Sequence, residues 1–148
     1  MKYSARPRHI IGCLVLLLLP LVSACSSPAA ASPQTLTGIL TDVHCYLKKP
    51  DIALDTKKCL LMPACSATGY GLVVQKADGT SDFYFLDGEF APAATGSQQK
   101  ALELINASAR TDHFYFTITG VVSADKKTIA YDKTYSVINV SSMAESEK

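Results

Sequence analysis

The feature that most constrains this fold is a segment without hydrophobic periodicity that carries three cysteines between two predicted strands. The strands are predicted at residues 35–43 and 70–76, and the segment between them holds Cys45, Cys59 and Cys65. A loop of about 25 residues inside a compact domain is usually functional, disordered or internally cross-linked. The cysteines favour the last of these, so we expect the segment to be cross-linked beside the sheet.

The first 24 residues predict a secretory signal peptide. Lys2, Arg6 and Arg8 make a basic start, and an almost unbroken apolar run follows over residues 10–19. The run is too short for a transmembrane helix, which needs about 20 apolar residues, but it fits the core of a signal peptide.

The predicted signal peptide runs into the sequence LVSAC at residues 21–25, which resembles the lipobox of bacterial lipoproteins. The resemblance implies that Cys25 is lipidated and becomes the new N-terminus, so that acyl chains anchor the chain in a membrane. It also implies a place at the cell membrane or outer membrane, with the domain facing the periplasm or the cell exterior. Ser26 rather than aspartate follows the cysteine, which by the same resemblance favours the outer membrane in a host that has one.

The rest of the chain divides into a tether, one domain and a tail. Residues 25–34 are mostly small residues and prolines, which cannot build a core and predict a flexible tether. Residues 35–141 are long enough for one small domain. Residues 142–148 are polar and predict a disordered tail.

The charge balance excludes nucleic acid as the expected partner. Three of the 14 basic residues lie in the leader, so the remainder has 11 Lys and Arg against 13 Asp and Glu, a net charge of −2. Phosphate binding requires a basic patch or stripe, and this sequence has only short lysine pairs. The expected contacts are the membrane, through the lipid anchor, and an unidentified small molecule or protein.

The order of predicted elements is strand, long loop, hairpin, helix and then two or three strands. The elements after the first strand are 70–76, 82–86, a helix at 98–109 with Ser97 as its N-cap, 113–122 with a bulge at Gly120, 128–131 and 134–140. This order predicts a mainly β fold with one helix, a five-stranded OB-like partly open barrel. An α+β open sheet and a small sandwich are the alternatives.

Several short motifs resemble small exported bacterial domains that begin with TGxLTDxxC. Here they are residues 37–42 followed by Cys45, the two later cysteines, the Asp78-Gly79 turn and the TITG sequence at 117–120. Such domains look like OB-type barrels of largely unassigned function. The resemblance therefore implies the fold and no particular activity.

The cysteine count leaves one thiol over. Without Cys13 in the leader and Cys25 at the lipidation site, Cys45, Cys59 and Cys65 remain, and an odd number indicates one disulfide with a free thiol, an intermolecular bond or a metal site. A structural disulfide, either Cys59–Cys65 or Cys45 with one of them, is the plainest interpretation in an oxidising compartment. It would stabilise the long loop by roughly 2–4 kcal/mol.

The alternative is a metal site in which His44 or Met62 adds a fourth ligand to the three cysteines. Thiolate and imidazole suit zinc, and thiolate with thioether suits copper(I). Two features oppose it: Cys59 and Cys65 are wider apart than the usual two-to-four-residue zinc spacing, and adjacent residues such as His44 and Cys45 point to opposite faces of a strand.

No catalytic motif accompanies the cysteines. The sequence has no GxSxG or HExxH motif, no glycine-rich phosphate loop and no CxxC pair. We therefore expect no enzyme, but an envelope lipoprotein acting as a binding or structural module with a disulfide-constrained loop. A metal-binding lipoprotein is the first alternative, and a thiol-redox accessory protein, with Lys57 and Lys58 beside Cys59, is the second.

Overall fold

The computed structural model describes residues 31–49, 51, 55–88 and 96–148, so the predicted signal peptide and Cys25 lie outside the described residues. The strands are β1 Gln34–Asp42, β2 Tyr70–Gln75, β3 Ser81–Asp87, β4 Tyr115–Val122, β5 Lys127–Thr128 and β6 Thr134–Glu145. The helices are α1 Val43–Lys48, α2 Lys57–Leu60, α3 Pro63–Ser66 and α4 Gly96–Ala107. Within the described ranges, no helix is long and apolar enough to cross a bilayer.

Five strands close into a barrel. The hydrogen-bonded order is β3-β2-β1-β4-β6, and a parallel pairing of β3 with β6 joins the two ends of this row. The other pairings in the barrel are antiparallel, and β5 extends the sheet as a short hairpin partner of β6. This closure confirms the predicted OB-like barrel in place of the open-sheet and sandwich alternatives.

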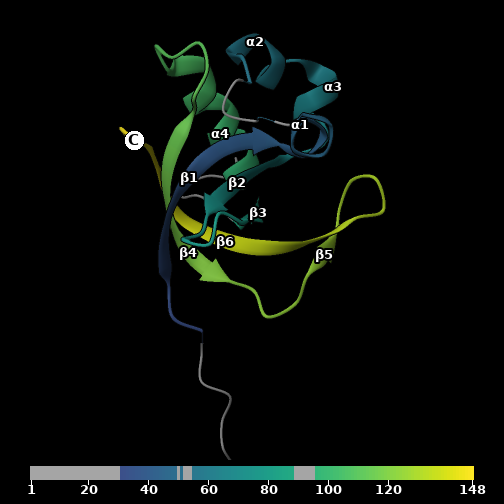
Figure 1. Ribbon diagram of the computed structural model, residues 1–148, viewed down its shortest axis with the longest axis vertical. Helices are drawn as coiled ribbons and strands as arrows, with labels where there is room; N and C mark the ends of the chain where they lie inside the picture. The colour runs from purple at the N-terminus through teal and green to yellow at the C-terminus, as the bar shows by residue number, and fades with distance from the viewer. Residues whose placement is uncertain (1–30, 50, 52–54, 89–95) are drawn as a thin grey trace, which may run out of the picture.

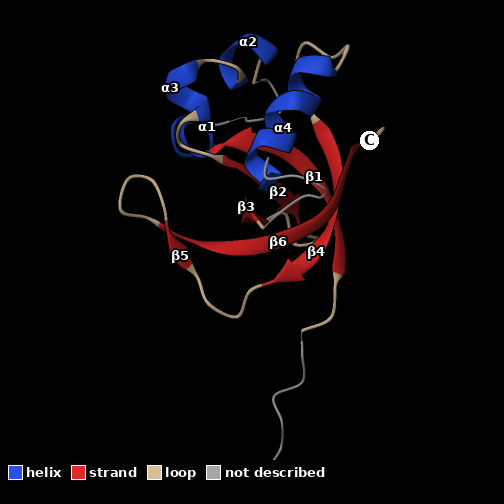
Figure 2. Cartoon of the chain, turned by 180° about the vertical axis from the view of Figure 1, so that it is seen from behind, coloured by secondary structure: helices blue, strands red, loops and turns tan. Residues whose placement is uncertain are grey.

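The barrel interior is filled by aliphatic and aromatic side chains from every barrel strand. They are Leu40, Leu72, Leu86, Phe116, Ile118, Ile138 and Val140. Alternate residues along β4 and just before it face the interior, since Phe114, Phe116 and Ile118 are all buried. Figures 1 and 2 show α4 and the three short helices gathered over the same end of the barrel.

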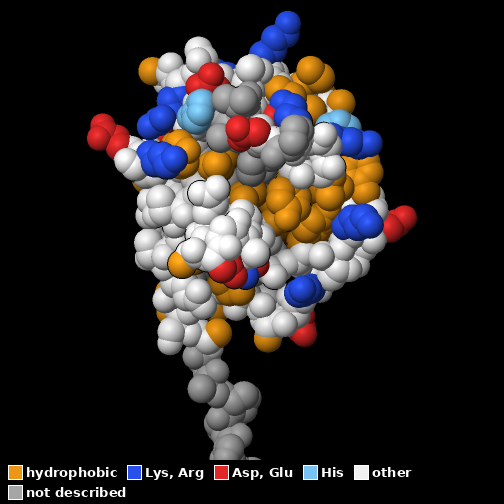
Figure 3. All heavy atoms as spheres, in the orientation of Figure 1, with side chains coloured by type: hydrophobic (Ala, Val, Ile, Leu, Met, Phe, Trp, Pro, Cys, Tyr) orange, Lys and Arg blue, Asp and Glu red, His pale blue; other side chains and the backbone are white. Residues whose placement is uncertain are grey.

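A second apolar cluster lies outside the barrel wall. Phe83 of β3 stacks on Tyr46 of α1 with ring centroids 4.5 Å apart, and it meets Tyr135 of β6 edge-on at 5.2 Å. Figure 3 shows hydrophobic side chains gathered on the face between α1 and β5. This cluster holds α1, which carries a cysteine, against the sheet.

The helix of the barrel starts differently from the prediction. Ser97 lies inside α4, is buried, and its hydroxyl has no hydrogen-bond partner among the described residues, so the prediction that Ser97 caps the helix is wrong. Instead, the next side chain fixes the helix to the barrel. The Gln98 amide donates to the carbonyls of Tyr70 and Leu86 at 3.1 and 2.6 Å and accepts from the Tyr70 N–H at 2.5 Å.

The last strand is longer than predicted. β6 continues to Glu145, and the Ser146 N–H donates to the Tyr115 carbonyl at 2.9 Å, so the predicted disordered tail from residue 142 is wrong over this stretch. The sequence pattern is weak there because Met143 is the one side chain of residues 141–145 that is buried. Pairing with β4 and an ion pair between Glu145 and Arg110 hold these residues.

The predicted bulge at Gly120 is confirmed. The pairing register of β4 and β6 shifts between Thr119 and Gly120, because Ser141 of β6 is an extra residue between the partners Ser142 and Val140. A Cβ atom at Gly120 would lie 2.3 Å from the carbonyl oxygen of Asn139, a contact that no side chain tolerates without a backbone shift.

We therefore expect Gly120→Ala to lower the free energy of unfolding by about 2–3 kcal/mol, the range of core overpacking. Urea unfolding measures this change. Gly79→Ala is the matched control, because a Cβ atom at Gly79 would have no atom within 4 Å beyond those of its chain neighbours. The only strain would come from the positive φ of 83° at this position. The control should cost about 1 kcal/mol. Equal stability of the two variants would contradict the close approach of β4 and β6.

Candidate metal centre

The cysteine segment is folded into three short helices, and each helix carries one cysteine. Cys45 lies on α1, Cys59 on α2 and Cys65 on α3. The sequence pattern predicts a loop over this segment, because helices of six and four residues are too short to show a hydrophobic period. Helix caps and contacts with the barrel therefore determine the positions of the three cysteines.

Asp42 fixes the position of Cys45. It is the last residue of β1 and the N-cap of α1, and its Oδ1 accepts the backbone N–H of Cys45 at 2.9 Å. The backbone N–H of Val43 donates to the Gly69 carbonyl at 3.0 Å. The turn from strand to helix therefore directs the Cys45 side chain toward the other two cysteines.

Cys59 is fixed by a second helix cap and by a tyrosine of the barrel. The Thr56 hydroxyl accepts the Cys59 N–H at 3.2 Å and caps α2. The next residue, Leu60, is fully buried, and its carbonyl accepts the Tyr70 hydroxyl at 2.6 Å. Burial raises the pKa of Tyr70 to about 12, so this hydroxyl remains a donor at physiological pH.

Cys65 lies on α3, a helix that begins with a proline. Pro63 occupies the first turn of α3, where its missing N–H leaves no bond unmade. The Cys65 carbonyl accepts the Thr68 hydroxyl at 2.7 Å, and the side chain is buried. A turn at Leu61 and Met62 separates α2 from α3, which is how cysteines six positions apart come to face each other.

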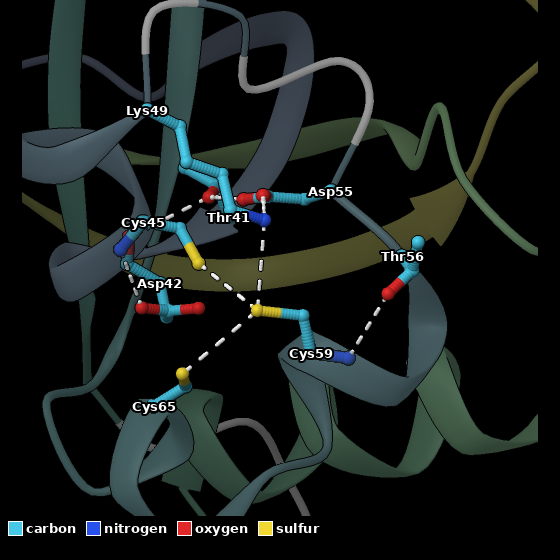
Figure 4. Close-up of polar contacts among 8 residues, drawn as sticks. All are labelled: Thr41, Asp42, Cys45, Lys49, Asp55, Thr56, Cys59 and Cys65. Atoms are coloured by element: carbon cyan, nitrogen blue, oxygen red, sulfur yellow. Dashed lines mark hydrogen bonds and ion pairs between the residues drawn. The ribbon is translucent and has the colours of Figure 1, made fainter.

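The three sulfur atoms converge (Figure 4). The Cys59 Sγ is 3.4 Å from the Cys45 Sγ and 4.0 Å from the Cys65 Sγ, and all three sulfurs lie within 4.8 Å of one another. Cys45 and Cys65 are buried, whereas Cys59 is partly exposed. All three are free thiols in this structure, so the expected disulfide stays a prediction.

Two buried carboxylates and one lysine adjoin the sulfurs. Asp55 is 1 % exposed, accepts the Thr41 hydroxyl at 2.8 Å and forms an ion pair with Lys49. The Lys49 ammonium also contacts the Cys59 Sγ at 3.6 Å. Asp42 is fully buried, and its Oδ2 has no hydrogen-bond partner among the described residues.

The electrostatic setting keeps two of the thiols protonated. Burial raises the pKa of Cys45, and the neighbouring Asp42 carboxylate raises it further. Burial and then the charge of Asp42 raise the pKa of Cys65. A cation that bound here would have to displace these protons, and its positive charge would reverse the effect of the carboxylates.

The other two predicted ligands are His44 and Met62. The His44 ring hydrogen-bonds through Nδ1 to the Tyr131 hydroxyl, which fastens α1 to the hairpin that follows β5. Met62 is 44 % exposed at the turn between α2 and α3. The structure thus brings Cys45, Cys59 and Cys65 together without His44, and it leaves the Met62 side chain largely open to solvent.

Sequence reasoning missed the polar part of the site. Asp42, Asp55 and Lys49 were not singled out, because no helix was expected after residue 43 and buried carboxylates carry no local pattern. The available signal was capping chemistry, since Asp42 and Thr56 each stand three residues before a cysteine.

A groove borders the site on its exposed side. It has a volume of about 770 Å³ and is lined by Lys49 and Tyr46 together with Arg110, Tyr115 and Lys148. The side chain of Lys49 lines this groove and also contacts the Cys59 Sγ, whereas none of the three cysteines lines the groove itself.

Comparisons with protein-family models and with curated proteins find no match to this chain.

We expect iodoacetamide to alkylate Cys59 about tenfold faster than Cys45 or Cys65 in the folded, metal-free protein, since the thiolate is the reactive form and the other two thiols are buried with raised pKa values. Timed labelling followed by mass spectrometry of proteolytic fragments measures the three rates. In denaturant the rates should become equal. Equal rates in the folded protein would contradict the burial of Cys45 and Cys65.

Proposed function

We propose that this chain is a lipid-anchored, non-enzymatic metal-binding protein of the bacterial cell envelope. Its metal ligands are Cys45, Cys59 and Cys65, and its metal is zinc or copper(I). The observation that carries the proposal is the convergence of three sulfurs from three separate helices at distances of 3.4 and 4.0 Å.

These distances suit a shared metal ion. Zinc–sulfur bonds of about 2.3 Å in tetrahedral directions place two thiolates about 3.8 Å apart. The two measured separations lie on either side of that value. A disulfide would use one sulfur pair and leave the third thiol without a role, whereas a metal uses all three.

The chemistry of the ligands sets the class of metal. Thiolates are soft ligands that select zinc and copper(I) over magnesium or calcium. The shell around the sulfurs is well ordered by hydrogen bonds, including Asp42 to the Cys45 backbone and Lys49 to the Cys59 sulfur. Such outer contacts orient metal ligands and raise affinity.

The envelope location rests on the lipobox resemblance at residues 21–25. A lipid on Cys25 and the short tether after it would hold the barrel near a membrane surface. A metal carried there would be exchanged with the compartment that the domain faces.

We expect the full chain, purified in detergent under reducing conditions, to bind one equivalent of zinc or copper(I). Elemental analysis measures the metal, and a thiol assay should find three thiols that react only after the metal is chelated. Serine at Cys45, Cys59 or Cys65 should each weaken binding by about 100-fold or more, because lost outer-shell partners alone cost 10–100-fold.

His44→Ala and Met62→Leu are the matched controls, since both residues lie near the cysteines in sequence, but the His44 ring bonds to Tyr131 and the Met62 side chain is exposed. They should bind metal as the unaltered chain does. The proposal would be overturned in favour of a structural disulfide by two thiols that react only after a reductant is added, together with no metal uptake by the reduced protein.

We expect Cys25→Ser to release the protein from bacterial membranes, because the thiol that accepts the lipid is gone. Detergent phase partitioning and incorporation of labelled palmitate measure the anchor. Cys13→Ser is the control and should partition as the unaltered chain does. Membrane retention of the Cys25→Ser variant would contradict lipid anchoring at this residue.

A further inference from the structure

Asp42 has one carboxylate oxygen that no group in the described part of the chain uses. Its Oδ1 accepts the Cys45 N–H at 2.9 Å, while its Oδ2 is buried and has no hydrogen-bond partner. A buried carboxylate oxygen without a partner is costly, so its presence in a native structure calls for a bound water or ion.

This free oxygen is directed toward the sulfurs. An oxygen of Asp42 lies within 4.8 Å of the Cys45 sulfur and of an oxygen of Asp55, in a group of candidate ligands that shares Cys45 with the group of three cysteines. The charge of Asp42 acts on both Cys45 and Cys65. In Figure 4 the carboxylate is drawn between the sulfur atoms of these two cysteines.

The second buried carboxylate is engaged differently. Asp55 accepts the Thr41 hydroxyl through Oδ2 and the Lys49 ammonium through Oδ1, so both of its oxygens have partners. Asp55 therefore serves to hold Lys49 beside Cys59, and Asp42 is the carboxylate that is free to bind a metal.

We propose that Asp42 Oδ2 is the fourth ligand, which completes a tetrahedral Cys₃Asp site and makes the resident metal zinc rather than copper(I). The inference rests on the proposed function, because it requires that the three cysteines bind a metal.

Coordination preference supports zinc. Zinc takes four ligands in a tetrahedron and accepts carboxylate oxygen at about 2.0–2.2 Å beside thiolates. Copper(I) favours soft sulfur ligands and gains little from a carboxylate oxygen. A donor set of three sulfurs and one oxygen is therefore matched to zinc.

Charge balance points the same way. Three thiolates and the Asp42 carboxylate carry four negative charges, of which a divalent ion cancels two and a monovalent ion one. The Lys49 ammonium beside Cys59 is already balanced by the Asp55 carboxylate, so it does not change this difference. Because uncompensated buried charge is expensive, the divalent ion leaves the more stable site.

The test compares Asp42→Asn with Asp55→Asn in the full chain purified in detergent, using competition titrations for Zn²⁺ and for Cu⁺. Asparagine at position 42 keeps the side-chain oxygen that caps α1 but replaces the free oxygen with an amide nitrogen that does not bind zinc. Asp42→Ser keeps the cap with a hydroxyl and serves as a second variant if the asparagine variant folds poorly, as judged by circular dichroism.

We expect both Asp42 variants to lose about 100-fold or more in zinc affinity, since even outer-shell losses cost 10–100-fold, and to keep copper(I) affinity unchanged or higher. Asp55→Asn should weaken both metals equally and by less. Absorption bands of the Co²⁺-substituted protein should shift in the Asp42 variants, because the oxygen ligand is replaced.

The inference would be overturned, with the proposed function left standing, if zinc affinity were unchanged in both Asp42 variants. A larger and zinc-selective loss in Asp55→Asn would overturn it in the same way. An equal loss of zinc and copper(I) affinity in the Asp42 variants would overturn it as well, because it would show a scaffold effect. Absence of metal binding by the unaltered chain would instead overturn the proposed function, and the inference with it.

Discussion

The hydrogen bond from the Cys45 N–H to Asp42 Oδ1 is the interaction on which the site depends. This bond lies at the junction of β1 and α1, where Asp42 pairs with Tyr70 of β2. One side chain thereby joins the barrel to the first of the three helices. The backbone of Asp42 is paired with β2, and its Oδ1 is bonded to the Cys45 N–H. These two contacts fix the position of its free oxygen relative to the barrel.

The barrel supplies the rigidity that the short helices lack. Isolated helices of four to six residues do not persist in water, since helix nucleation is unfavourable and tertiary contacts must offset its cost. Here Tyr70 donates to the Leu60 carbonyl, and the Lys57 N–H donates to the Thr111 carbonyl at 2.7 Å. The thiols are therefore positioned by strands that lie before and after them in the chain.

The sequence predicted the barrel well because strand alternation and turns are local signals. Residues 113–122 indicated a strand, which the structure shows as β4, and Gly120 indicated the place where its pairing with β6 is irregular. The extension of β6 and the three short helices were missed, because pairing with a distant strand and capping by a preceding residue leave little periodicity. The three cysteines could be identified from the sequence alone. The unpartnered oxygen of Asp42 can be recognised only in the folded structure.

The cysteine count and an oxidising compartment favoured a disulfide, whereas the proposed metal site would give the third thiol a role. In the metal-free state, Cys45 and Cys65 are buried beside a carboxylate that raises their pKa values, which stabilises the protonated thiols. A divalent cation would change the sign of that environment, because it favours the thiolates and the carboxylate together. The same burial that makes these thiols unreactive without metal would then shield a bound ion from water and competing ligands.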